Sequence, residues 1–294
     1  MIGYYLFRFF ETVFLALPYA LQKGFISFLG HITFFFDFKH KRIIQANLEH
    51  TIKDKISQEK YETILSHCHK NLIQVVWQVL QSTKTTVQDL RDIVSFENED
   101  IVNKAKATGK PIIFISAHYG NWELGGTSLS ALISPTTTIH KKMNDNYFDD
   151  YLMKSRTKFN MNMVEKRGAI KHLIKTLKKG GSISMLIDQS VKQTDGIIID
   201  FLGQKATQTA APAFLARKFD AIIIPLLINN APNKERTITF YEPIITAKTD
   251  NEEQDILNSA QAQADFLSNA ILQYPEPWFW CHKRFKAVSP EMYK

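Results

Sequence analysis

The residues of this chain best suited to chemistry are His118 and Glu123, in the segment AHYGNWE at positions 117–123. A carboxylate that accepts from one imidazole nitrogen fixes the tautomer and leaves the other nitrogen as a base near neutral pH. Five residues apart across a predicted turn, the two side chains are expected to meet. Gly120 permits close backbone approach, and N–H groups near Gly120 and Asn121 are candidate oxyanion donors. A lone loop histidine is usually structural, so the combination carries the prediction that His118 is catalytic.

The elements around this segment place it at a strand end. The unbroken apolar run 112–115 predicts a buried strand, and 121–133 predicts the helix that follows. Sites in open parallel sheets form at the carboxyl ends of strands. His118 is therefore expected on the loop that leaves the strand, and Glu123 in the first turn of the helix.

Beyond residue 109 the pattern alternates between strands and helices, which is typical of a mostly parallel sheet. Further strands are expected at 137–140, 183–187, 197–199 and 222–228, with an edge strand at 236–241. Helices are expected at 59–81, 146–159, 169–179, 209–219 and 252–273. The predicted fold class is α/β, with a mostly parallel central sheet flanked by helices.

Residues 1–38 differ from the rest of the chain. They hold ten of the 21 phenylalanines and only four formally charged residues, and the basic run KHKR follows at 39–42. Pro18 would break or kink a helix, and the charge-free stretches are short for a spanning helix of about 20 apolar residues. We interpret 1–38 as an aromatic-rich helical membrane segment that lies on the membrane or spans it weakly. The alternative is a buried helical hairpin.

Composition narrows the class of protein. The net charge of +7 favours an acidic partner, such as a phosphorylated lipid, an anionic membrane, an acidic carrier protein or nucleic acid. The two cysteines exclude a disulfide framework. In the HCH run at 67–69, consecutive helical residues point about 100° apart, so no metal site is expected there. No nucleic-acid motif or Gly-rich phosphate loop occurs, so nucleic acid is not an expected partner.

Several motifs resemble one known family. The HYGNWE segment is similar to the His-x-x-x-x-Asp/Glu signature of the lysophospholipid and glycerolipid acyltransferase superfamily. The residues between His118 and Glu123 resemble those of the lipid A biosynthesis acyltransferases, the lauroyl and myristoyl transferases of Gram-negative bacteria. Other matches follow in the family's order: RIIQANL at 42–48, Arg167, Asp188-Gln189, FLGQKAT at 201–207 and WCHKRFK at 280–286. Departures are the HKK run at 140–142 in place of a Tyr-Arg pair, Pro277 in place of Gln, and Ser268 in place of Glu.

The resemblance implies transfer of a fatty acyl chain from an acyl carrier protein thioester to a hydroxyl of a lipid A precursor. This is late acylation in lipopolysaccharide biosynthesis, on the cytoplasmic face of the bacterial inner membrane. His118 would activate the hydroxyl directly, without a serine or cysteine nucleophile, a metal or a cofactor. The implied acyltransferase domain is 39–294, with a helical lead-in at 39–110 and an α/β core at 111–294. Expected partners are the carrier protein, the lipid A precursor and inner membrane lipids.

The resemblance also implies substrate-binding residues: Gly120, Asn121, Arg167, Asp188, Gln189 and Arg284. Arg167 is a candidate for a lipid phosphate or the thioester carbonyl, the alternative being a surface salt bridge. Asp188 and Gln189 would line the pocket, or else order a loop. Arg284 would bind phosphates or the carrier, unless it belongs to a solvated basic tail.

Two other functions stay open. A glycerophospholipid acyltransferase that uses acyl carrier protein or acyl coenzyme A thioesters would share the base, although the closing segment 280–286 argues against it. A non-catalytic membrane protein that holds anionic lipids would explain 1–38 and the basic charge but leaves the spacing of His118 and Glu123 unexplained.

Overall fold

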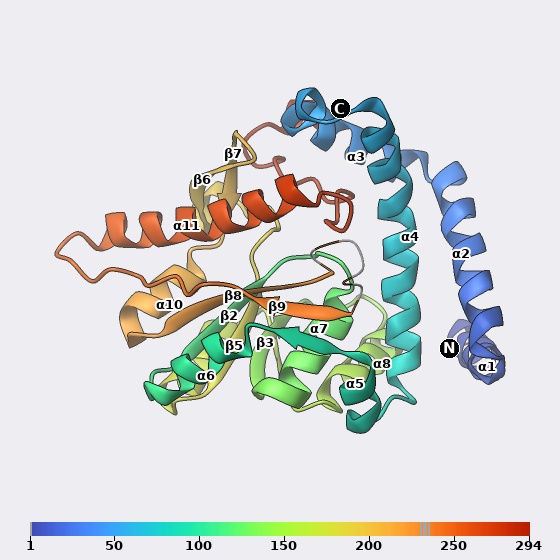
Figure 1. The fold of residues 1–294 in the computed structure, drawn as a ribbon, viewed down its shortest axis with the longest axis horizontal. Helices are drawn as coiled ribbons and strands as arrows, with labels where there is room; N and C mark the ends of the chain where they lie inside the picture. Colours follow the sequence, from blue (N-terminus) through green and yellow to red (C-terminus); the bar gives the residue numbers. More distant parts are fainter. Residues whose placement is uncertain (1, 230, 232–233, 235) are drawn as a thin grey trace.

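A sheet of seven strands runs through the structure, a computed structural model that describes residues 2–229, 231, 234 and 236–294 (Figure 1). The strand order is β1-β9-β8-β2-β5-β3-β4, and neighbouring strands are parallel except β8 and β9. The strands are β1 (Ser95–Glu97), β2 (Ile112–Ser116), β3 (Thr136–His140), β4 (Met161–Glu165), β5 (Ser182–Leu186), β8 (Ile222–Ile228) and β9 (Thr237–Phe240). The predicted α/β class with a mostly parallel sheet is confirmed.

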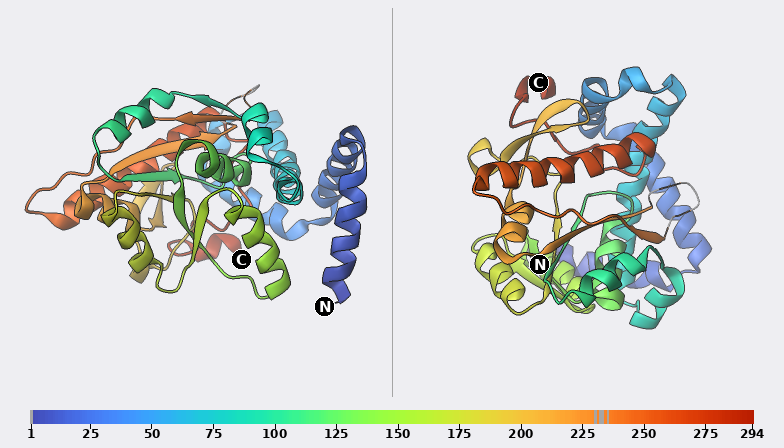
Figure 2. Two further views of the ribbon diagram at one scale, coloured as in Figure 1. Left: turned by 90° about the horizontal axis from the view of Figure 1, so that it is seen from below. Right: turned by 60° about the vertical axis from the view of Figure 1, so that its left-hand side comes forward.

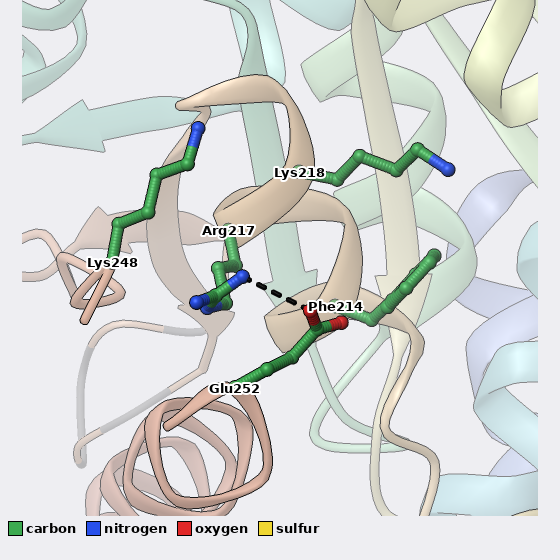
Figure 3. Close-up of a pocket in the computed structure, with 5 residues that line it drawn as sticks. All are labelled: Phe214, Arg217, Lys218, Lys248 and Glu252. Atoms are coloured by element: carbon green, nitrogen blue, oxygen red, sulfur yellow. Dashed lines mark hydrogen bonds and ion pairs between the residues drawn. The ribbon is translucent and has the colours of Figure 1, made fainter. Parts of the chain in front are cut away.

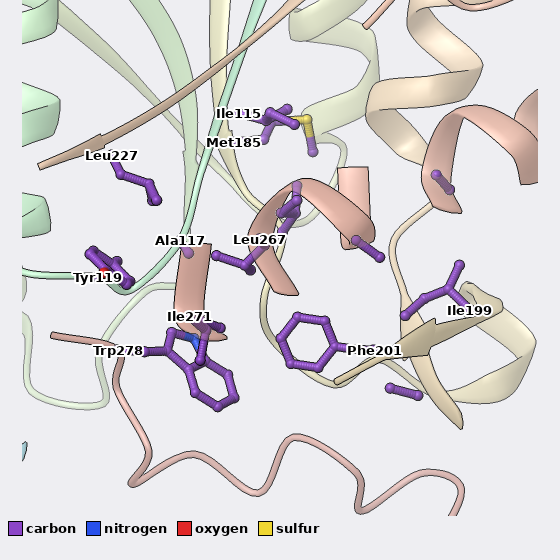
Figure 4. Close-up of a cluster of buried hydrophobic side chains, with 14 of the residues drawn as sticks. Ile115, Ala117, Tyr119, Met185, Ile199, Phe201, Leu227, Leu267, Ile271 and Trp278 are labelled. Atoms are coloured by element: carbon purple, nitrogen blue, oxygen red, sulfur yellow. The ribbon is translucent and has the colours of Figure 1, made fainter. Parts of the chain in front are cut away.

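Helices cover both faces of this sheet because its central strands are apolar on both sides. In β2, Ile112 and Phe114 pack against one helical layer, and Ile113 and Ile115 pack against the other. Figure 4 shows Ile115 beside Met185 in the second of these clusters. The first layer is α5 (Val87–Ile93), α6 (Glu99–Ala107) and α7 (Trp122–Ser128). The second is α9 (Ala169–Lys178), α10 (Ala211–Phe219) and α11 (Glu252–Gln273). Full burial of each such side chain contributes about 2 kcal/mol to folding.

Two strand predictions are corrected, and two strands are found that the sequence did not predict. Residues 197–199 do not join the central sheet, because β6 (Ile197–Phe201) pairs antiparallel with β7 (Gln204–Gln208) in a separate hairpin. The run 236–241 contains β9, which is no edge strand: β1 pairs with it on the outer side. This β1 lies in the lead-in at 39–110 that was predicted to be helical. The sequence analysis also missed β4, which follows α8 (Asn146–Thr157).

The N-terminal segment forms two helices, α1 (Ile2–Ala16) and α2 (Tyr19–Phe36), separated at Pro18. This N-terminal hairpin stands at one side of the molecule, with α2 along α4 (Gln58–Ser82) (Figures 1 and 2). Phe14 and Ile26 are buried in it. Its remaining large apolar side chains are mostly exposed: Tyr5, Leu6, Phe9, Phe10, Val13, Leu17, Tyr19, Leu21, Phe25, Phe28, Phe35 and Phe36. Within the described chain, no helix combines the length and apolar character that crossing a membrane requires.

A short helix, α3 (Phe38–Thr51), leads from the hairpin into α4, and both helices contact the C-terminal segment. The side-chain amide of Asn47 on α3 donates to the Trp280 and His282 carbonyls at 2.7 and 2.8 Å. The Cys68 and Cys281 sulfur atoms lie 3.3 Å apart as buried free thiols. The described residues include no group of three His, Cys, Asp or Glu side chains placed to hold a metal ion.

Candidate active site

The sheet register brings His118 opposite Asp188. Ser116, the last residue of β2, pairs with Leu186, the last residue of β5. His118 and Asp188 each follow two positions after these paired residues. The His118 ring atom Nδ1 lies 2.9 Å from Oδ1 of Asp188, and the His118 backbone N–H donates to Oδ2 at 3.0 Å. Two neighbouring strands therefore deliver an imidazole–carboxylate pair to the carboxyl edge of the sheet.

The charges of this pair define the protonation of the ring. Burial of Asp188 favours its neutral form, but the charge and hydrogen bonds of His118 and the indole N–H of Trp278 outweigh it and hold the Asp188 pKa at about 2. An ionised carboxylate accepts only, so Nδ1 carries the proton and Nε2 presents its lone pair. Burial of the His118 ring opposes its charging, but the charge of Asp188 outweighs this and raises the His118 pKa.

Glu123 does not orient the ring, which corrects the sequence-based mechanism. It lies in the first turn of α7 as predicted, where Asn121 caps the helix by accepting from the Leu124 N–H at 3.2 Å. Its carboxylate binds Arg156 of α8, with Oε2 at 3.0 Å from Nε and Oε1 at 2.5 Å from Nη2. None of the hydrogen bonds among the described residues joins it to His118, although its charge raises the His118 pKa. No sequence motif indicates that Arg156 belongs to this site, because only the packing of α8 brings its side chain there.

Aromatic side chains surround the open face of the His118 ring. Trp122 meets the ring edge-on with centroids 5.2 Å apart, and Phe279 lies at 6.1 Å. The exposed Gln189 brings its amide nitrogen to 3.4 Å from Nε2. The His118 side chain keeps 17% of its surface exposed, whereas that of Asp188 keeps 4%. The His118 ring thus faces an apolar surface, while Asp188 is shielded from solvent.

Gly120 allows the close backbone approach that its residue type predicts. Its backbone is left-handed at φ +56°, and a Cβ there would collide with the Ile228 carbonyl oxygen. Its N–H donates to the Pro277 carbonyl at 2.9 Å, and its own carbonyl accepts from the Asn71 amide at 3.1 Å. Because the Gly120 N–H is already paired, it is not available to an oxyanion, and donation by the neighbouring N–H groups stays a prediction. The hydrogen bonds described for Asn121 give it the role of a helix cap.

Asp188 and Arg284 are also reassigned. Asp188 is buried behind the His118 ring, so it holds the ring in place through Nδ1 and does not line a pocket. Arg284 is fully buried, with its guanidinium over the Phe201 ring and Nη1 donating to the Gln189 and Thr207 carbonyls. Burial lowers its pKa to about 10. It orders the loop after Asp188, and no part of it reaches a ligand at the surface.

Arg167 is exposed just beyond the carboxyl end of β4, on the same edge of the sheet as His118. The two are separated by β5 and β3, which at about 4.8 Å per strand gives a lateral distance of roughly 14 Å. The structure therefore does not bring Arg167 into contact with the catalytic pair. It leaves Arg167 at the rim of the same edge.

A surface pocket of about 260 Å³ lies elsewhere (Figure 3). It is lined by Phe214, Arg217, Lys218, Lys248 and Glu252. Because α10 ends just before β8 begins, the pocket lies at the amino ends of the parallel strands, opposite His118. Arg217 is occupied there by Glu252 at 3.2 Å and Asp255 at 2.9 Å. This pocket has no part in the chemistry of His118.

Comparison with known proteins shows the family of this chain. The family model described as bacterial lipid A biosynthesis acyltransferase matches residues 1–287. The chain is 22% identical over 284 residues to a lipid A biosynthesis lauroyltransferase of Escherichia coli K12, covering 94% of this chain and 88% of the relative. It is 20% identical over 278 residues to a lipid A biosynthesis acyltransferase of Haemophilus influenzae, covering 95% and 86%. It is 19% identical over 272 residues to a lipid A biosynthesis palmitoleoyltransferase of E. coli K12, covering 92% and 86%. With its family model matched over nearly all of its length, this chain belongs to the bacterial lipid A biosynthesis acyltransferase family.

Proposed function

We propose that this acyltransferase moves a fatty acyl chain from an acyl carrier protein thioester to a hydroxyl of a lipid A precursor, as a late acylation of lipopolysaccharide biosynthesis. The observation that carries the proposal is the His118–Asp188 pair at the carboxyl edge of the sheet. Its Nε2 atom faces Trp122, Phe279 and the exposed Gln189, whose amide nitrogen lies 3.4 Å away.

In the proposed reaction Nε2 of His118 takes the proton of the acceptor hydroxyl as its oxygen attacks the thioester carbonyl carbon. The tetrahedral intermediate then collapses, the carbon–sulfur bond breaks, and the departing sulfur takes the proton from the imidazolium. The products are an ester and the free carrier thiol. Asp188 holds the ring tautomer and stabilises the imidazolium, while Glu123 adds negative charge nearby. General-base catalysis of this kind supplies roughly 10²- to 10⁴-fold, and the step uses no cofactor besides the carrier-bound thioester.

The N-terminal hairpin is the proposed membrane contact. One side of it packs on α4, while large aromatic side chains such as Phe9 and Phe28 are 70% and 60% exposed. Helices with an apolar face and basic flanks bind at the level of the lipid headgroups, and the run 39–42 supplies the flank. The protein would thus lie on the cytoplasmic face of the inner membrane, in reach of its lipid acceptor.

The rim around Arg167 is the proposed site for the acceptor's phosphate groups. Lys141 and Lys142 follow β3, and Lys166 and Arg167 follow β4, where His140 pairs with Glu165 in the sheet register. All four are exposed, and none forms an ion pair with any acidic side chain that the structure describes. Four cations on adjacent strand ends repel one another, so an anionic group bound between them would relieve that repulsion.

Acyl transfer with purified protein tests the proposal. The full chain would be incubated in mixed micelles with a lipid A precursor and either an acyl carrier thioester or the matching coenzyme A thioester. Product mass identifies the acyl group and the acceptor. Transfer from the carrier thioester to the lipid A precursor supports the proposal. Transfer only to lysophospholipid points to glycerophospholipid acylation, and vesicle binding without any transfer points to a non-catalytic lipid-binding protein.

A further inference from the structure

The C-terminal segment 277–279 pairs with the catalytic loop along its backbone. The Gly120 N–H donates to the Pro277 carbonyl at 2.9 Å, and the Phe279 N–H donates to the His118 carbonyl at 2.8 Å. These two bonds frame an antiparallel bridge between Tyr119 and Trp278. Backbone contacts on both sides therefore fix Trp278 relative to the loop that carries His118.

Packing fixes the orientation of the Trp278 ring. The residue is 1% exposed, and its ring centroid lies 5.5 Å from Phe201 and 4.6 Å from Trp280. Figure 4 shows the indole beside Ile271, with Phe201 close by. In this position Nε1 donates to Oδ2 of Asp188 at 3.1 Å. Because neighbours enclose the ring, the donor cannot swing away without disturbing the core.

The two carboxylate oxygens of Asp188 accept hydrogen bonds from different donors. Oδ2 accepts from the His118 backbone N–H and from the Trp278 indole, and Oδ1 accepts from the His118 ring. We propose that Trp278 is a positioning residue for acyl transfer, whose indole N–H holds the Asp188 carboxylate so that Oδ1 remains aimed at Nδ1 of His118. This inference rests on the proposed role of His118 as the base. It gives the C-terminal segment a role in positioning the base.

The indole N–H also moderates the charge that Asp188 presents. A donor on Oδ2 stabilises the carboxylate and reduces the negative potential at the imidazole. Loss of that donor should therefore raise the His118 pKa further. The other charged groups that act on the pair come from other positions: Glu123 on α7, Arg156 on α8, and His282 and Arg284 in the C-terminal segment. Substitution of Trp278 leaves all four in place.

A matched pair of variants tests the inference. Trp278→Phe removes the donor to Asp188, whereas Trp280→Phe removes an equally buried indole whose N–H donates to the Pro275 carbonyl at 2.8 Å. Both should lower the unfolding temperature through lost core volume. Only Trp278→Phe should move the acid limb of the kcat/KM profile to higher pH, by roughly 0.5 to 1 pH unit. This is less than the full effect of one hydrogen bond to a charged group, because the indole acts on the His118 ring through Asp188. An unmoved limb in Trp278→Phe, or equal movement in both variants, would overturn the proposal.

Two further measurements separate positioning from folding and from turnover. Benzothienylalanine in place of Trp278 replaces the N–H by sulfur in a ring of nearly the same shape, so the core stays filled if Trp278→Phe does not fold. NMR titration of histidine-labelled protein without substrate, with the His118 signals identified by their loss in His118→Gln, reads its pKa directly. A raised His118 pKa in a protein that transfers no acyl group would uphold the positioning role and refute the proposed function. An unchanged pKa with benzothienylalanine would refute the positioning role itself.

Discussion

Glu123 and Arg156 join helices α7 and α8 through a two-point ion pair, with Oε2–Nε at 3.0 Å and Oε1–Nη2 at 2.5 Å. Their side chains keep only 14% and 19% of their surface exposed. The same α8 contacts the N-terminal hairpin, because the Tyr151 hydroxyl donates to the buried Glu11 carboxylate at 2.7 Å. One helix therefore connects the proposed membrane contact to the helix that follows the catalytic loop.

We expect Glu123 and Arg156 to be strongly coupled. Removal of either partner leaves a poorly solvated charge unpaired, which costs more than removal of both. Glu123→Gln and Arg156→Gln should each destabilise the protein, and the double variant should be less destabilised than the sum by about 1 to 3 kcal/mol. Chemical unfolding of the four proteins measures this coupling. Additive effects would show that the ion pair contributes no joint stabilisation.

His118→Ala should fold and bind membranes like the wild type while its turnover falls by a factor on the order of 10² or more. The wild-type profile should also be informative, since only the neutral ring accepts a proton. Because the His118 pKa is raised above its ordinary value of 6.5, kcat/KM should increase with pH through a limb that lies above 6.5. Acyl transfer at nearly the wild-type rate by His118→Ala would end the proposed mechanism.

Asp188→Asn should be nearly as damaging as loss of the base. The amide can donate to Nδ1, which favours the tautomer with its proton on Nε2, and a drop of about 10² to 10⁴ in kcat is expected.

In the wild type the Asp188 pKa is depressed from 3.8 to about 2, so its ionisation stabilises the fold above pH 3.8. That stabilisation is lost as the pH falls from about 4 to about 2. Acid unfolding curves should show this loss in the wild type and lack it in Asp188→Asn.

The exposed side of the N-terminal hairpin should control membrane binding. Phe9→Glu and Phe28→Glu place charges on exposed side chains, so they should reduce flotation with anionic vesicles and leave the unfolding temperature nearly unchanged. Ile245→Glu is the matched control, because Ile245 is 69% exposed and lies far from the hairpin in sequence. Unaltered flotation of the two phenylalanine variants would contradict a membrane role for this surface.

The rim around Arg167 should recognise the phosphates of the acceptor. Arg167→Glu and Lys142→Glu should raise KM for a phosphorylated acceptor several-fold and have little effect with a dephosphorylated one. Added salt should reduce the difference by screening, with a Debye length of about 8 Å at physiological ionic strength. Lys178→Glu serves as control, because it reverses an exposed charge at the far end of α9. Equal changes for both acceptors would remove the phosphate assignment.

The sequence by itself determined the framework of the site. A histidine on a strand-to-helix loop is predicted by the apolar run 112–115 and by the glycine and asparagine after His118. The helix that carries Glu123 begins where the pattern indicates. Such features are local, since burial of alternate side chains and helix capping depend on residues within a few positions. For the same reason the N-terminal helices and their break at Pro18 were predictable.

Only the tertiary structure decided which carboxylate pairs with His118. Asp188 and Glu123 are both acidic residues near a strand end, but the parallel register of β2 and β5 puts Asp188 against His118, while α8 brings Arg156 to Glu123. It likewise buried Arg284, which the sequence placed at the surface. Strand order and helix packing join residues tens of positions apart, so spacing within one motif cannot show which charges will meet. The physical reason is that a buried charge is stable only beside its partner, and packing of the whole chain selects that partner.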